Sequence, residues 1–158
     1  MQLFVHPDVT EDLVSKRLAA RMSRQKRLFT REIPTLFLVD QLALYRLVGS
    51  PEIMAAQMQH LIAMASRPRV TIQVVPVCWH SGMSGGFILT DRAGYAEAVH
   101  AGQVHGDDET VGALASRFDS IRSEAMRASE SATLIREMLA HERLAKVNLL
   151  KRQRRRLR

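Results

Sequence analysis

The chain has 158 residues, of which 46% are hydrophobic and 25% are charged, with a formal net charge of +7. These proportions are those of an ordinary globular domain, and no apolar run approaches the roughly 20 residues that span a bilayer. The N-terminal residues lack the layout of a signal peptide, and the single cysteine excludes an internal disulfide. We therefore expect a cytoplasmic protein with no membrane partner.

The first predicted element is an amphipathic helix. Asp8 and Glu11 have the spacing of a capping box. Apolar residues then recur at helical spacing, at Val9, Leu13, Val14, Leu18 and Met22. Seven of the sixteen residues from Lys16 to Arg31 are basic, so this helix has a charged outer face that is either solvated or in contact with phosphates.

A strand and two helices follow. Residues 34–40 read PTLFLVD, and their continuous apolarity indicates a strand buried on both faces. Asp40 can cap a short helix after it. Ser50 and Pro51 then mark a second helix start, with a capping residue before a proline. The buried stripe expected on this helix consists of Met54, Met58, Leu61, Ile62 and Ala65.

The second half of the chain predicts adjacent strands and then two helices. Residues 69–77 form an apolar strand, and residues 86–91 and 94–99 form two more, joined by a hairpin turn at 91–94. The expected order is αβααβββαα. This order indicates an α+β fold with a small mixed sheet of about four strands flanked by helices, in a single domain of residues 1–150.

The excess of positive charge lies mainly in the last eight residues, 151–158. They hold six basic residues and no acid, which leaves a net charge of only +1 for residues 1–150. We expect this segment to be a disordered basic tail that either binds nucleic acid weakly through phosphates or only keeps the chain in solution. The candidate nucleic-acid contacts are Arg152, Arg154, Arg155, Arg156 and Arg158.

One long series of motifs resembles a known family. The segments REIPTLFLVDQLALYRLVGSPEIMAAQMQHLIAMASRPRVTIQVVPV, WHSGMSGGFIL and YAEAV follow one another in that order. They resemble the C-terminal domain of unknown function of actinobacterial Scr-family, antitoxin-like, XRE-type transcriptional regulators. The resemblance implies a regulatory module that receives a small-molecule effector or a small partner protein, often encoded beside it, and that forms a homodimer.

Two features depart from the pattern of that family. In the family, a helix-turn-helix that binds promoter DNA precedes this domain, and no segment before Val9 is long enough to hold one. The region from 94 to 109 matches only loosely, although Glu97 falls where the family places an acid. We therefore do not expect this chain to read a DNA sequence by itself.

The glycine-rich loop after the second predicted strand carries the candidate site. Trp79 and His80 are not needed for a turn, so they are candidates for contact with a ligand or partner. Alternatively, His80 holds the loop by bonds to backbone groups, and Trp79 covers the sheet. Gly82, Gly85 and Gly86 allow the turn, and no helix follows them to favour anion binding.

Catalysis and metal binding have less support in the sequence. His80 and Glu97 are the one acid–base pair that adjacent strands could bring together. Cys78 is expected to be a buried thiol at a strand end, without a carboxylate placed to orient a Cys78–His80 pair. His100, His105, Asp107 and Asp108 match no zinc spacing, and we expect no metal and no cofactor.

Two functional hypotheses therefore remain. The first is a non-catalytic domain that binds an effector or partner and regulates transcription, with a site at Trp79, His80, Gly82, Gly85, Gly86 and Glu97. The second is a stand-alone enzyme of a biosynthetic cluster, with a pocket near Trp79 in which His80 and Glu97 are catalytic. An enzyme requires an enclosed cavity with converging titratable groups, whereas a binding domain requires exposed apolar surface.

Overall fold

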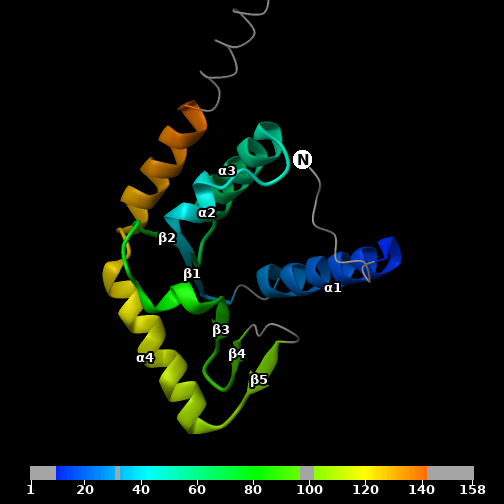
Figure 1. The fold of residues 1–158 in the computed structure, drawn as a ribbon, viewed down its shortest axis with the longest axis vertical. Helices are drawn as coiled ribbons and strands as arrows, with labels where there is room; N and C mark the ends of the chain where they lie inside the picture. The colour runs from blue at the N-terminus through cyan, green and yellow to red at the C-terminus, as the bar shows by residue number, and fades with distance from the viewer. Residues whose placement is uncertain (1–9, 31–32, 97–101, 142–158) are drawn as a thin grey trace, which may run out of the picture. The chain divides into compact units, whose positions relative to one another are not determined.

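The computed structural model describes residues 10–30, 33–96 and 102–141, and the chain divides into two compact units (Figure 1). The first unit comprises Met1–Thr35 and the second Leu36–Arg158. Glu97 and the basic tail of residues 151–158 lie outside the described residues, so the predictions made for them remain predictions.

The first unit contains one long helix, α1 (Glu11–Thr30). The Leu13 N–H donates to Thr10 Oγ1 at 3.3 Å, and the Val14 N–H donates to the Thr10 carbonyl oxygen at 3.0 Å. Thr10 therefore caps the first turn of the described helix; Asp8, predicted to form a capping box with Glu11, lies outside the described residues. The apolar stripe of α1 is about half exposed, at Val14, Leu18 and Met22.

The remaining elements confirm the α+β class. In chain order they are β1 (Thr35–Asp40), α2 (Gln41–Tyr45), α3 (Pro51–Ala65), β2 (Val70–Val75), the 3₁₀ helix η1 (Ser81–Ser84), β3 (Phe87–Leu89), β4 (Gly94–Ala96), β5 (Gln103–His105) and α4 (Asp108–Glu124). A further helix covers residues 128–141. This order is the predicted one with β5 added.

The strands form two sheets where the sequence predicts one. β1 pairs with β2, and β3, β4 and β5 form a separate three-stranded sheet. The backbone of Val74 in β2 bonds instead to two residues near the last helix, one just before that helix and one within it. The Val74 N–H donates to Ser131 Oγ at 2.9 Å, and the Met126 N–H donates to the Val74 carbonyl oxygen at 2.9 Å. Because Val74 is already paired there, β3 does not extend this sheet.

The strand β1 is less buried than its apolar sequence predicts. None of its residues is fully buried, and Phe37 is exposed. A continuous apolar run indicates burial on both faces only where layers cover both faces. In a sheet of two strands, that covering is incomplete.

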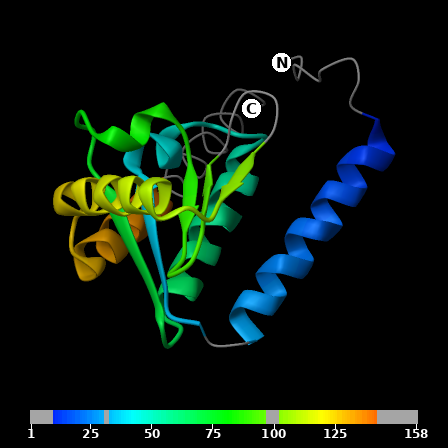
Figure 2. The same cartoon turned by 90° about the horizontal axis from the view of Figure 1, so that it is seen from below.

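The helix α4 lies across the three-stranded sheet and contacts β3 and β4 (Figure 2). The hairpin between β3 and β4 closes with a bond from the Thr90 N–H to the Ala93 carbonyl oxygen at 2.9 Å, as the turn prediction requires. Gly94 is buried under α4, where a Cβ atom would collide with the Leu114 side chain. A glycine at this position therefore lets α4 approach the sheet.

The described core lies entirely in the second unit. Helices α3 and α4 both contact β2. The buried apolar side chains are Leu44, Met54, Met58, Met64, Ile72, Val74, Val75, Leu114, Ile121, Ile135 and Leu139. Of the stripe predicted for α3, Met54 and Met58 are buried, whereas Leu61, Ile62 and Ala65 are only half-buried. Met64 is the third buried residue of this helix. Among the described residues, no helix has both the length and the apolarity needed to cross a bilayer.

Candidate functional site: an anchored glycine-rich loop

The candidate site is the loop of residues 76–86 between β2 and β3. Pro76 follows the last residue of β2 and has no N–H to continue a ladder. η1 then forms over Ser81–Ser84, and Gly85 follows it with a φ of 138°. This positive φ is one that glycine adopts without strain, so Gly85 serves the turn as predicted, and Gly86 leads into β3.

Both ring nitrogens of His80 hold this loop in place. The Gly82 N–H donates to His80 Nδ1 at 3.1 Å, which places the ring proton on Nε2. His80 Nε2 lies 3.4 Å from Asp40 Oδ2, and the His80 side chain is only 5% exposed. His80 therefore makes a bond to the loop backbone, as its structural interpretation predicts.

The carboxylate beside His80 is Asp40, at the start of α2. Its other oxygen, Oδ1, accepts the Leu42 N–H at 2.7 Å and caps the helix, which confirms Asp40 as a cap. The same side chain thus fixes the beginning of α2 and the beginning of η1. The sequence analysis selected Glu97 as the acid near His80, and Glu97 lies outside the described residues.

Three N–H groups in and around η1 are bonded within the loop. The Gly82 N–H bonds to His80, the Met83 N–H donates to the His80 carbonyl oxygen at 3.2 Å, and the Gly85 N–H donates to the Gly82 carbonyl oxygen at 3.3 Å. A Cβ atom at Gly82 would also lie 2.8 Å from His80 Nδ1. These glycines therefore fit a tight turn better than an anion cradle.

Arg117 of α4 holds the loop from a second side. Its Nε donates to the Ser81 carbonyl oxygen at 3.0 Å, and one terminal nitrogen donates to Ser84 Oγ at 2.8 Å and to the Gly85 carbonyl oxygen at 3.0 Å. The guanidinium group also lies over the Phe87 ring, 4.8 Å from its centroid. The sequence analysis missed Arg117 because nothing local distinguishes it from other helical arginines.

Trp79 is exposed to solvent, and contacts with other elements hold the chain on both sides of it, at Val77 and at His80. Its side chain is 91% exposed, so the prediction that it covers the sheet is wrong. On one side His80 is buried and bonded. On the other, the Val77 N–H donates to Gln41 Oε1 at 3.2 Å. Cys78, expected to be buried, is also exposed.

Gln41 brings a second exposed aromatic residue to this loop. Its Nε2 donates to the Tyr45 hydroxyl at 3.4 Å while its Oε1 accepts from Val77. Tyr45 is 60% exposed and Val77 is 61% exposed. We call Tyr45, Val77 and Trp79 the Trp79 surface. Neither Gln41 nor Tyr45 was a sequence candidate.

The remaining predicted candidates do not assemble into a site within the part of the chain that the structure describes. There, no three His, Cys, Asp or Glu side chains gather closely enough to hold a metal ion. His105 ends β5, while Asp107 caps α4 by accepting the Thr110 N–H at 2.8 Å. His100 lies outside the described residues.

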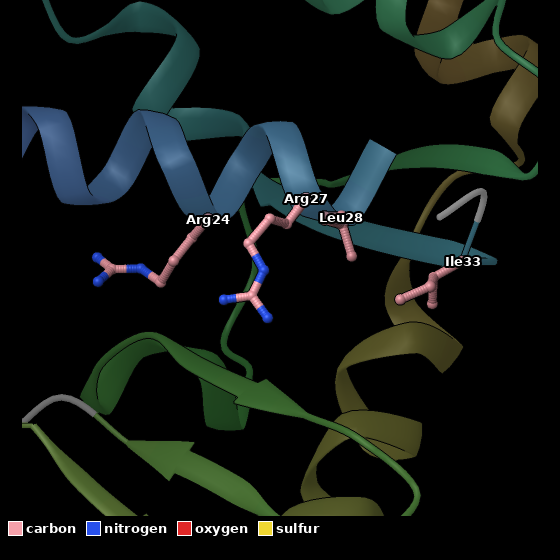
Figure 3. Close-up of a pocket in the computed structure, with 4 residues that line it drawn as sticks. All are labelled: Arg24, Arg27, Leu28 and Ile33. Atoms are coloured by element: carbon pink, nitrogen blue, oxygen red, sulfur yellow. The ribbon is translucent and has the colours of Figure 1, made fainter. Parts of the chain in front are cut away.

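The first unit has an open pocket of its own. Arg24, Arg27, Leu28 and Ile33 line it, and its volume is about 230 Å³. Figure 3 shows both guanidinium groups extending from the same side of α1. The pocket is smaller than the roughly 300–1,000 Å³ that encloses a drug-sized ligand.

The comparisons with known proteins give one match. Residues 1–137 match the family model described as "Domain of unknown function (DUF5753)". Neither the curated proteins nor the solved structures include a significant match to this chain.

Proposed function

Because this chain belongs to the DUF5753 family, we propose that it is the partner-binding domain of an antitoxin-like transcriptional regulator, in which the Trp79 surface receives a small partner protein. The regulator type, an actinobacterial XRE-type protein of the cytoplasm, comes from the resemblance of the motifs described above. A small-molecule effector is the other ligand that the resemblance implies.

One observation supports binding at this surface above all. Trp79 is 91% exposed on a loop whose flanking residues, Val77 and His80, are both bonded to the start of α2. A large apolar side chain is costly to leave in water, and a fixed backbone lowers the entropy lost on docking. Tryptophan and tyrosine are also the residues most enriched among those that dominate binding energy.

The geometry at His80 favours this proposal over the enzymatic alternative. A general base needs a nitrogen within reach of its substrate, whereas His80 Nδ1 accepts the Gly82 N–H and Nε2 faces Asp40 Oδ2 at 3.4 Å. Catalysis by His80 and Glu97 stays a prediction, as does homodimer formation.

The test is to isolate the chain from its own host and to identify what it retains by native mass spectrometry. Binding of the small protein encoded beside it is then measured by isothermal titration calorimetry. Trp79→Ala should weaken this binding by about 30-fold or more, because a hot-spot residue contributes at least ~2 kcal/mol.

Val104→Ala is the matched control. Val104 is 75% exposed on β5 and is not part of the Trp79 surface, so its removal should leave the affinity unchanged. Wild-type affinity in Trp79→Ala would refute the proposal. So would turnover of a small molecule by the wild-type chain that His80→Ala abolishes without unfolding the protein.

A further inference from the structure

The first unit carries a row of arginines along α1. Arg17, Arg21, Arg24 and Arg27 are spaced by four, three and three residues, so they share one broad face of the helix. All four are exposed. At ~1.5 Å per residue they extend over roughly 15 Å. We call these four residues the α1 arginine row.

This row has no compensating carboxylates in the described residues. The only acids within α1 are Glu11 and Asp12 in its first turn. Asp12 Oδ2 is already 2.7 Å from Lys16 Nζ, one turn away. Within residues 10–30, 33–96 and 102–141, none of the four arginines forms an ion pair. As far as the described residues go, the row is therefore a line of charge without ion-pair partners.

The pocket at the end of the α1 arginine row indicates which chemical group the row can bind. Arg24 and Arg27 extend their guanidinium groups on the same side of α1, with Leu28 beside them (Figure 3). Arginine guanidinium groups bind phosphate oxygens through paired N–H donors, and both of these side chains line the same open space. The pocket is open and small, which suits a phosphate that is part of a longer strand.

We propose that the α1 arginine row binds the phosphate backbone of duplex nucleic acid without reading its sequence. A stretch of duplex as long as the row, roughly 15 Å, carries about four phosphates on each strand, at ~3.4 Å of helix axis per phosphate. This assignment is separate from partner binding at the Trp79 surface, which lies in the other unit.

A duplex fits these observations better than an anionic membrane does. Helices that lie in a membrane surface have a strongly apolar face, rich in Trp, Phe and Leu. The exposed apolar stripe of α1 contains Val14, Leu18 and Met22, each about half exposed, and the charged side chains far outnumber them. The row of arginines is the dominant feature of the helix.

The test measures binding of the complete 158-residue chain to a short DNA duplex of arbitrary sequence, by filter binding between about 50 and 200 mM salt. The variant replaces Arg17, Arg21, Arg24 and Arg27 by Gln, which is also a good helix former. The slope of log affinity against log salt should become shallower by about 0.9 for each phosphate that the variant no longer neutralises, and the affinity at low salt should fall at least tenfold.

The control removes the same charge from the tail. Replacing Arg152, Arg154, Arg155 and Arg156 by Gln changes the net charge equally but leaves the α1 arginine row intact, so a large part of the affinity should remain. Equal losses in both variants would show that only net charge matters and would overturn the proposal. Circular dichroism of both variants must show the helix content of the wild type.

Two further measurements separate this site from the alternatives. Lysine at the four positions keeps the charge and should keep most of the salt dependence, whereas the same loss as with Gln would contradict phosphate binding. Vesicles of phosphatidylserine and phosphatidylcholine test the membrane; binding to vesicles and not to the duplex would overturn the proposal. Trp79→Ala should bind the duplex like the wild type.

Discussion

His80 joins two elements that are distant in the sequence, and its replacement should be costly. His80→Ala removes the acceptor of the Gly82 N–H and the partner of Asp40 Oδ2. A buried polar group left without a partner costs about 1–3 kcal/mol. We expect the free energy of unfolding, measured with urea, to fall by that amount.

Two other substitutions make this prediction specific. His80→Asn retains a side-chain acceptor two residues before the Gly82 N–H, as in an Asx turn, and should recover part of the loss. Trp79→Ala, in the adjacent exposed position, should change the free energy of unfolding by less than about 0.5 kcal/mol. An equal effect at both positions would contradict the anchoring role of His80.

At the residue scale, the sequence identifies which kinds of side chain the loop carries. It does not identify the residues that those side chains contact. The residues next to His80 in the sequence suffice to propose two roles for it, holding the loop or binding a ligand. Its actual partner, Asp40, is forty positions away, and Arg117 reaches the loop from more than thirty positions away. Such contacts depend on tertiary packing, and no local pattern encodes them.

At the scale of elements, the N-terminus of α4 depends on one carboxylate. Hydrogen bonds from Thr110, first through its side chain and then through its backbone N–H, hold the pKa of Asp107 below its ordinary value of 3.8. Because the pKa is lower in the folded chain, this carboxylate favours folding above that ordinary value. The contribution disappears as the pH falls through the lowered pKa.

This pH dependence can be measured with Asp107→Asn. Asparagine also caps helices but carries no charge, so the wild type should be more stable at neutral pH. The difference between the two urea midpoints should shrink as the pH falls below the ordinary value of 3.8 and through the lowered pKa. Asp107→Ala, which removes the cap, should be less stable than Asp107→Asn at every pH. A difference that is constant with pH would contradict this assignment.

Helix starts could be predicted where a local signal is unambiguous. Ser50 accepts the Ile53 N–H at 3.4 Å and Pro51 begins α3, as expected. The division into two sheets could not be predicted, because it depends on Ser131 reaching back to Val74. A serine inside a helix indicates no such contact on its own.

At the scale of the whole molecule, the core does not include the first unit. Every described buried apolar residue lies between Leu44 and Leu139. A chain that begins at Thr35 should therefore fold by itself and unfold in one cooperative transition, with a urea midpoint close to that of the full chain. Circular dichroism during urea denaturation measures this.

The shortened chain also separates the two proposals. It lacks the α1 arginine row and should lose duplex binding that depends on it, yet it retains the Trp79 surface and should bind the partner protein as before. A shortened chain that aggregates or unfolds without cooperativity would show that the first unit is needed for the fold.

The exposure of Trp79 has a practical consequence. It is the one tryptophan of the sequence, and its indole ring is surrounded almost entirely by water. Its intrinsic emission should therefore have a long-wavelength maximum and be readily quenched by iodide. Any molecule that covers this ring should shift the emission to shorter wavelength and protect it from the quencher. The protein thus carries its own optical reporter at the position where we expect docking.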